Sequence, residues 1–109
     1  MNFGTIIKKI ETEIQCIITD GNDVYGVYGF GSFFRHGRGN DIDILVVADS
    51  TSVVLTDLYD LVAASFKKIS IEICIDIDMT FFTFEEFIEK PLIESNSLFL
   101  IYQKGAPHN

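Results

Sequence analysis

Two aspartates two residues apart, Asp41 and Asp43, open an apolar run that ends at Val47. In a β-strand the side chains of residues i and i+2 project from the same face, so both carboxylates could reach one ligand. Oxygen ligands of this kind suit a hard divalent cation such as Mg2+. A pair of solvated aspartates is also common at a strand start where no metal binds, because water screens their repulsion. The pair indicates a site only if a second feature supports it.

Gly31 and Ser32 supply that second feature about ten residues earlier. They directly follow a predicted strand and begin what we expect to be a short helical turn. A glycine lets the backbone approach a phosphate closely, and the exposed N–H groups, the Ser32 hydroxyl and the guanidinium of Arg35 can all donate to it. A phosphate cradle beside cation ligands predicts a site for a metal-bound nucleoside triphosphate.

A third set of carboxylates lies in the segment 71–79, where the residue types alternate. Alternation of this kind predicts a strand with one apolar and one polar face. The two predicted faces are Ile71, Ile73, Ile75 and Ile77 on one side, and Glu72, Cys74, Asp76 and Asp78 on the other. Asp76 and Asp78 share a face, so either could supply a third carboxylate to the site.

The elements that must position these residues follow from periodicity. Residues 4–19 carry isoleucines on one helical stripe and predict an amphipathic helix, and Val24–Phe30 reads as a buried strand. Residues 35–40 form a polar, glycine-rich link to a second buried strand at 41–47. The residues from Gly31 to Asn40 are too few for a usual parallel crossover, so we expect the two strands to be antiparallel. Gly31 and Asp41 then lie at the same end of the sheet.

The second half of the chain continues the pattern. Residues 53–69 predict a helix with Leu55, Leu58, Tyr59, Val62, Phe66 and Ile69 on its core face. Thr83 and Glu86 form a T-x-x-E capping box that opens a shorter helix. Leu98–Tyr102 fits either a short strand or a helix end, and residues 105–109 resemble a frayed tail. We expect an α/β (α+β) fold, a small mixed sheet of three to four strands with helices packed on it, in a single domain spanning residues 1–109.

Composition narrows the function classes. The 109 residues carry a formal net charge of −8, which disfavours direct nucleic-acid binding, because basic side chains supply most affinity for the phosphate backbone. Cys16 and Cys74 have no nearby cysteine or histidine, so we expect reduced core thiols rather than a disulfide or zinc site. No segment resembles a signal peptide or an apolar membrane span, which favours a cytoplasmic location.

The motif Gly31-Ser32-Phe33-Phe34-Arg35, followed by residues 40–47, resembles the signature of the polymerase-beta-like nucleotidyltransferase superfamily in its minimal bacterial form. That signature is Gly-Ser, a spacer, Asp-x-Asp and an apolar run, with a third carboxylate on a later strand. The spacer here is shorter by a residue or two than the common form, and His36 stands where a glycine is usual. The resemblance implies the fold of that superfamily. It also implies transfer of a nucleoside monophosphate from an NTP, with ATP favoured, to an acceptor hydroxyl.

Carried over position by position, the resemblance implies a role for each motif residue. Gly31, Ser32 and Arg35 would bind the β- and γ-phosphates, and Asp41 and Asp43 would bind two Mg2+ ions, or Mn2+ in their place. The third metal ligand and catalytic carboxylate would be Asp78, with Asp76 as the alternative. Asp78 is favoured because the family often has an aspartate, an apolar stretch and then Thr-x-x-Glu.

The sequence says less about the acceptor of the nucleoside monophosphate than about the NTP that donates it. Relatives that modify small molecules usually carry an additional helical domain, which this sequence lacks. The resemblance therefore implies that the acceptor could be a second protein, with the antitoxin of a HEPN-type toxin–antitoxin pair as precedent. An acidic chain suits a basic helical partner of that kind. The alternative is a catalytically silent module of the same fold that pairs with a protein or senses a nucleotide.

Overall fold

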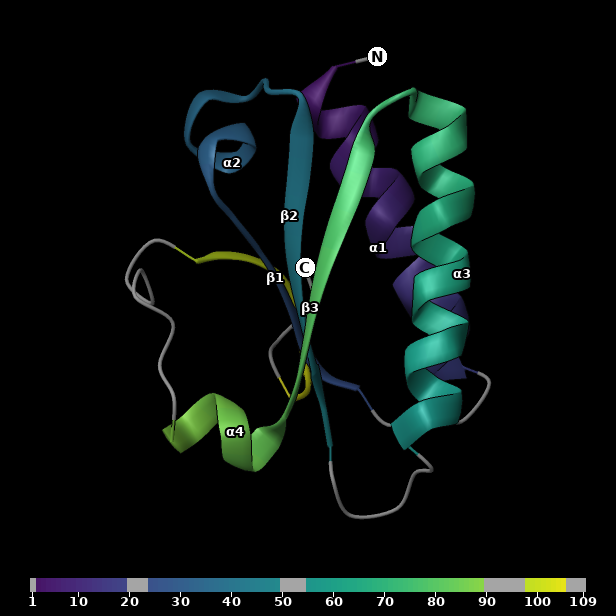
Figure 1. Cartoon of the computed structure of the whole chain (residues 1–109), viewed down its shortest axis with the longest axis vertical. Coiled ribbons are helices and arrows are strands. Elements are labelled where there is room, and N and C mark those ends of the chain that lie inside the picture. Colours follow the sequence, from purple (N-terminus) through teal and green to yellow (C-terminus); the bar gives the residue numbers. More distant parts are fainter. Residues whose placement is uncertain (1, 20–23, 50–54, 90–97, 106–109) are drawn as a thin grey trace.

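The computed structural model describes residues 2–19, 24–49, 55–89 and 98–105, which form a four-stranded mixed sheet with helices packed on it (Figure 1). The strand order is β3-β2-β1-β4. The strands are β1 (Val24–Phe30), β2 (Asp41–Ala48), β3 (Asp76–Thr83) and β4 (Phe99–Gln103), and the helices are α1 (Phe3–Thr19), α2 (Ser32–His36), α3 (Leu55–Ile73) and α4 (Phe84–Glu89). The expected α/β (α+β) architecture is confirmed.

The pairing of the strands sets which residues meet at each end of the sheet. β1 and β2 are antiparallel, as the short link between them predicts, and β4 pairs antiparallel with the other edge of β1. β2 and β3 are parallel, joined by α3, since a parallel pair needs a long crossover. The end of β1, the start of β2 and the start of β3 therefore lie together, at the top of Figure 1.

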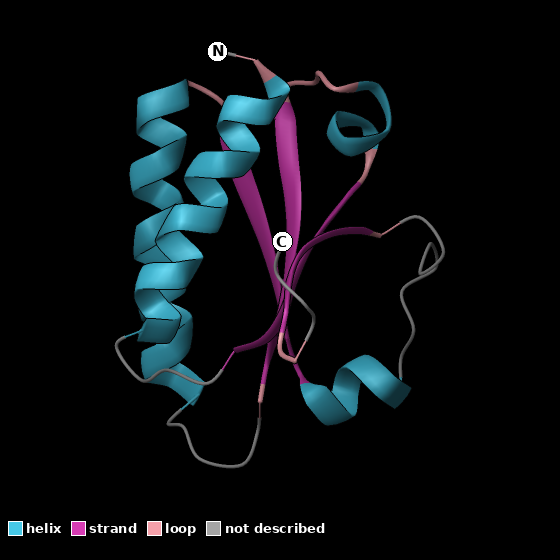
Figure 2. Cartoon of the chain, turned by 180° about the vertical axis from the view of Figure 1, so that it is seen from behind, coloured by secondary structure: helices cyan, strands magenta, loops and turns pink. Residues whose placement is uncertain are grey.

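Helices α1 and α3 cover one face of the sheet, and this layer contains most of the core (Figure 2). The isoleucine stripe of α1 is buried as predicted. Along β2 the residues that face these helices are apolar and fully buried, and those of β3 also pack against them. The core members from the two helices and β2 are Ile6, Ile10, Ile14, Ile17, Leu58, Val62, Phe66, Ile69, Ile73, Ile42, Ile44, Val46 and Ala48.

The opposite face of the sheet is divided into two parts. Near the far end of β2 a smaller cluster of Tyr28, Leu45 and Val47 is covered by aromatic side chains that include Phe84 and Phe87 of α4. At the near end this face carries the aspartates. The capping box that opens α4 is confirmed, because Thr83 N–H donates to Glu86 Oε1 at 2.9 Å and Glu86 N–H donates to Thr83 Oγ1 at 3.2 Å.

The third predicted strand, at 71–79, is wrong in its position. Helix α3 extends to Ile73 and β3 begins only at Asp76. The alternation at 71–77 imitates a strand, but Val62, Phe66, Ile69 and Ile73 also follow the helical period and all of them are buried. Cys74, with φ of 59°, ends the helix. Ile71, placed on the same face as Ile73 by the strand prediction, is 71% exposed, while Ile73 is 9% exposed.

Other expectations were settled by the structure in different ways. Leu98–Tyr102, left open between strand and helix, falls largely within the strand β4. Cys16 and Cys74 are both exposed, so the prediction of core thiols is wrong: Cys16 lies off the apolar stripe of α1 and Cys74 lies in a turn. Tyr59 is exposed rather than in the core, although its ring packs on Phe81.

A few expectations fall outside the described residues: the start of the 53–69 helix before Leu55 and most of the tail at 105–109. Within the described ranges no helix has the length and apolarity that crossing a membrane requires.

The helical assignment of residues 71–73 can be tested with two isoleucines two residues apart. Ile73→Ala should lower the free energy of unfolding by about 2–5 kcal/mol, because it leaves a cavity in the core. Ile71→Ala should change it by less than about 0.5 kcal/mol, since that side chain is in solvent. Urea denaturation of both variants measures the difference, and equal losses would support the strand instead.

Candidate active site

The site begins with a close approach between the loop after β1 and the second aspartate of β2. Phe30, the last residue of β1, pairs with Asp43, so Gly31 directly follows it beside that carboxylate. Gly31 has φ of 80° and ψ of −172°, a backbone region essentially restricted to glycine. A Cβ added there would lie 2.5 Å from Asp43 Oδ2. Backbone conformation and space both require glycine at this position.

Helix α2 is fixed in place by aromatic packing. Phe33 is buried and its ring stacks on Phe3 of α1 with 5.4 Å between centroids, while Phe34 packs against Phe99 of β4 at 5.3 Å. The ring of Phe34 also occupies the space that a side chain at Gly29 would need. Phe33 and Phe34 are therefore structural residues that hold the turn carrying Ser32 against the sheet.

The predicted phosphate ligands lie on the exposed side of this turn. Ser32 and Arg35 are both exposed and stand three residues apart on α2, the spacing that puts side chains on one helix face. The Arg35 N–H donates to the Gly31 carbonyl at 3.2 Å and closes the turn. The first N–H groups of such a turn have no acceptor within it, so they can face a ligand.

The four aspartates form a two-by-two array on two parallel strands. Asp41 pairs with Asp76, and Asp43 pairs with Asp78, and residues in register on adjacent strands share a face. All four lie on the sheet face away from α1 and α3, since the intervening Ile42 and Ile44 are in the core on the other side. Of the four, Asp43 is the one that the backbone of Gly31 approaches.

The electrostatics of the array single out Asp43. Its pKa is raised above the ordinary aspartate value, first by burial and then by the negative charges of Asp78 and Asp41. Asp43 is half-buried while the other three are exposed. A carboxylate that is partly desolvated and flanked by like charges favours a bound cation or a proton.

The fit of the array to a metal is partial. In the described ranges no three His, Cys, Asp or Glu side chains converge closely enough to enclose an ion by themselves. Mg2+ is commonly held by one or two carboxylates, with waters and substrate phosphates as its other ligands, so complete convergence is not required. The raised pKa of Asp43 and its contact with the Gly31 loop match a site completed by phosphate oxygens.

This architecture is shared with a solved structure. A protein from Sulfolobus solfataricus, provisionally described as a nucleotidyltransferase, matches 94% of this chain and 84% of its own with a TM-score of 0.63 and 17% identity. The chain has a nucleotidyltransferase fold. At this identity the similarity is one of fold, and the chemistry depends on the residues of the site.

A second similarity is weaker. A mutant of the toxin–antitoxin complex MntA–HpeT matches 65% of this chain and 55% of that chain, with 24% identity and a TM-score of 0.41. No protein-family model and no curated protein matches the sequence.

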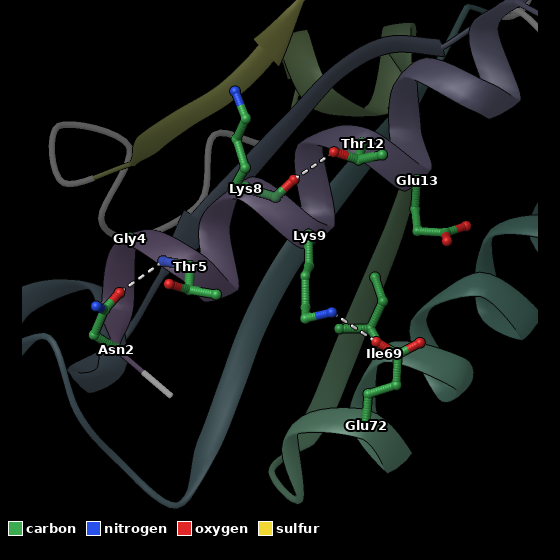
Figure 3. A pocket seen from close by; sticks show the side chains of 9 residues that line it. All are labelled: Asn2, Gly4, Thr5, Lys8, Lys9, Thr12, Glu13, Ile69 and Glu72. Carbon is green, nitrogen blue, oxygen red and sulfur yellow. Dashed lines mark hydrogen bonds and ion pairs between the residues drawn. The ribbon is translucent and has the colours of Figure 1, made fainter.

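A hollow of about 710 Å3 lies elsewhere on this nucleotidyltransferase fold, between α1 and α3 (Figure 3). It is on the helical side of the sheet, away from the aspartates. Lys9 on its wall pairs with Glu72 at 2.9 Å, and Glu13 pairs with Lys68 at 3.0 Å, so both ion pairs join the two helices. These side chains serve helix packing.

A smaller hollow adjoins the candidate site. It is lined by His36, Arg38, Gly39 and Asn40, in the link that leads into β2. The sequence alone did not mark Arg38 or Gly39 as site residues, because a polar, glycine-rich link has no periodicity. His36 stood out only as a departure from the family signature, and Asn40 only as its edge. The presence of two arginines within four residues of an acidic chain was a signal that could have marked the link.

Two glycine-to-alanine variants can test whether the contact with Asp43 adds to the cost of backbone strain at position 31. Gly31→Ala should destabilise the fold by about 1–3 kcal/mol from backbone conformation alone, and further by displacing Asp43. Gly37→Ala is the control for positive φ in open space, although the αL conformation of Gly37 (φ 73°, ψ 11°) is less restricted to glycine than that of Gly31. It should cost about 1 kcal/mol. Equal losses in thermal or urea unfolding would mean that the contact with Asp43 is unimportant.

The repulsion at Asp43 predicts a stability that depends on pH. Because its folded pKa is raised, Asp43 contributes stability that is complete below the ordinary aspartate pKa and is lost as pH rises through the folded value. Asp43→Asn should therefore raise Tm at pH 7 without divalent cations, by about 2–5 °C. The gain should shrink as pH falls through the raised folded pKa and vanish below the ordinary aspartate value of about 3.9, where Asp43 is protonated in both the folded and the unfolded state.

Asp60→Asn serves as the control, since it removes the same charge from the exposed surface of α3. Differential scanning calorimetry at low ionic strength measures both variants. A lower Tm for Asp43→Asn at pH 7 would contradict the repulsion.

Proposed function

We propose that this protein transfers a nucleoside monophosphate from an NTP, with ATP favoured, to an acceptor hydroxyl and releases pyrophosphate. The observation that carries the proposal is the contact between Gly31 and Asp43. It puts a loop suited to phosphate binding against a carboxylate whose pKa is raised by burial and by two neighbouring carboxylates. A negatively charged ligand can be accommodated there only with cations, which is the situation of a metal-bound triphosphate.

Each group of residues has a separate task in the proposed reaction. Asp41, Asp43 and Asp78 would hold Mg2+, for which Mn2+ could substitute. Two such ions supply stabilisation of the charge on the attacking and leaving oxygens of an in-line displacement. The Gly31 backbone and the Ser32 hydroxyl would orient the β- and γ-phosphates, with Arg35 on the same face of α2.

The choice of Asp78 over Asp76 as the third carboxylate has support in the register. Asp78 pairs with Asp43 and is the first of the two charges that raise its pKa, whereas Asp76 pairs with Asp41 at the outer end. In this position Asp78 would also accept the proton of the acceptor hydroxyl as the oxygen attacks the α-phosphorus.

For the acceptor we propose a hydroxyl on a partner protein with a basic, helical surface. The net charge of −8 supports this choice, because complementary charge speeds association and selects partners. The second candidate function is nucleotide binding without transfer. The incomplete convergence of the carboxylates favours it, since a silent module need not assemble a closed metal centre.

The two carboxylates of β3 offer a matched test, because they share a strand, a face and a charge. With Mg2+ and ATP, Asp78→Asn should lower the rate of pyrophosphate release at least ~100-fold, since metal-mediated charge stabilisation is worth several kcal/mol. Asp76→Asn should lower it less than about 10-fold. Pyrophosphate release in the presence of an acceptor protein, measured by a coupled assay, gives the rates.

Binding separates the two candidate functions. Isothermal titration should show that wild type binds ATP only with Mg2+ and that the double variant Asp41→Asn/Asp43→Asn does not. Binding that the double variant retains would refute the metal site. Metal-dependent binding with no pyrophosphate release from any NTP, even with a partner bound, would favour the silent module.

A further inference from the structure

The link between α2 and β2 forms an exposed hollow of about 560 Å3, lined by His36, Arg38, Gly39 and Asn40. It opens at the same end of the sheet as the aspartate array, immediately before Asp41. Gly37, with φ of 73°, ends α2 and turns the chain towards the hollow. Arg38 belongs to neither the Gly-Ser nor the Asp-x-Asp motif.

The hollow is continuous with the proposed phosphate cradle. The backbone of Gly39 lies against the first residues of α2: a Cβ at Gly39 would be 3.5 Å from Ser32 Oγ and 3.6 Å from the Phe33 nitrogen. Arg38 precedes Asp41 by three residues, so their Cα atoms are at most about 11 Å apart. A ligand seated on the Ser32 hydroxyl can therefore reach the side chain of Arg38 without leaving the surface of the site.

The distribution of positive charge supports a role for Arg38. In the described residues the cations Lys8, Lys9, Lys67 and Lys68 lie on α1 and α3, the helices that cover the other face of the sheet. Lys104 pairs with Asp49 at 2.8 Å. Arg35 and Arg38 are the guanidinium groups at the acidic end, and within the described ranges Arg38 makes no ion pair or hydrogen bond.

Positive charge is in short supply at this end of the sheet. Asp41, Asp43, Asp76 and Asp78 together with a triphosphate remain negative overall even when two divalent cations are bound. A guanidinium offers five N–H donors in a planar fork that matches two phosphate oxygens. One such group offsets part of the excess negative charge.

We propose that Arg38, supported by the hollow that it lines, binds the terminal phosphates of the nucleotide and holds them as the departing pyrophosphate. The inference rests on the proposed function and extends it to a residue outside the motif. It makes the site selective for a nucleotide with a polyphosphate chain over a nucleoside monophosphate, because a monophosphate has no β- or γ-phosphate for Arg38 to bind.

The experiment compares Arg38→Gln with Arg38→Lys and with Lys67→Gln, which removes one positive charge from the exposed surface of α3. Isothermal titration in the presence of Mg2+ measures the affinity for ATP. Displacement of ATP by AMP or by inorganic pyrophosphate measures the affinity for the nucleoside monophosphate part and for the terminal phosphates separately. Arg38→Gln should lower the affinity for ATP and for pyrophosphate by roughly 10- to 100-fold, and the affinity for AMP by less than about 2-fold. The affinities of Arg38→Lys should lie between those of wild type and Arg38→Gln, and the affinities of Lys67→Gln should equal those of wild type.

The possible failures are distinguishable. If wild type binds no ATP in the presence of Mg2+, the proposed function fails, and the role of Arg38 fails with it. If wild type binds ATP but Arg38→Gln and Lys67→Gln have the same affinity for it, only the role of Arg38 is overturned. The same holds if Arg38→Gln lowers the affinity for AMP as much as the affinity for ATP. Circular dichroism confirms that each variant is folded, which is expected because Arg38 is exposed.

Discussion

The absence of a side chain at Gly31 is the constraint on which the candidate site depends. It allows the loop after β1 to pass against the carboxylate of Asp43, in a backbone conformation that other residues rarely adopt. Everything that surrounds this contact serves to hold it. The antiparallel pairing of β1 with β2 brings Phe30 opposite Asp43, and the rings of Phe33 and Phe34 fix the turn that follows.

The sheet separates the tasks of stability and chemistry by its two faces. One face of β2 is fully apolar and packs beneath α1 and α3, so the fold does not depend on the residues of the other face at its near end. That end is free to carry four aspartates, and at Asp43 burial and the negative charges of Asp78 and Asp41 disfavour the ionised form in the absence of a cation. Local instability of this kind is common where a site is built to bind a charged ligand.

Much of this arrangement can be predicted from the sequence, because short local sequence patterns determine it. The capping box at Thr83 and Glu86, the antiparallel order of β1 and β2, and the shared end of Gly31 and Asp41 were all predicted correctly. The strand boundary at 71–76 was not, because Ile73 fits both the period of 2 of the four isoleucines at 71–77 and the helical period of Phe66 and Ile69. The register of β2 with β3 is a non-local property, so the sequence could not decide which aspartate lies beside Asp43. The link at 37–40 has no periodicity, and its contact with Ser32 is visible only in three dimensions.

The central claim is that Asp43 and Asp78, with Asp41, form a metal centre beside the Gly31 loop. The most direct measurement is the anomalous scattering of a crystal soaked with Mn2+ and a non-hydrolysable ATP analogue. The account predicts one or two manganese peaks within ligand distance of Asp43 and Asp78, with the triphosphate against Gly31 and Ser32. Manganese bound at Asp76 without Asp78, or a triphosphate bound elsewhere on the protein, would contradict it.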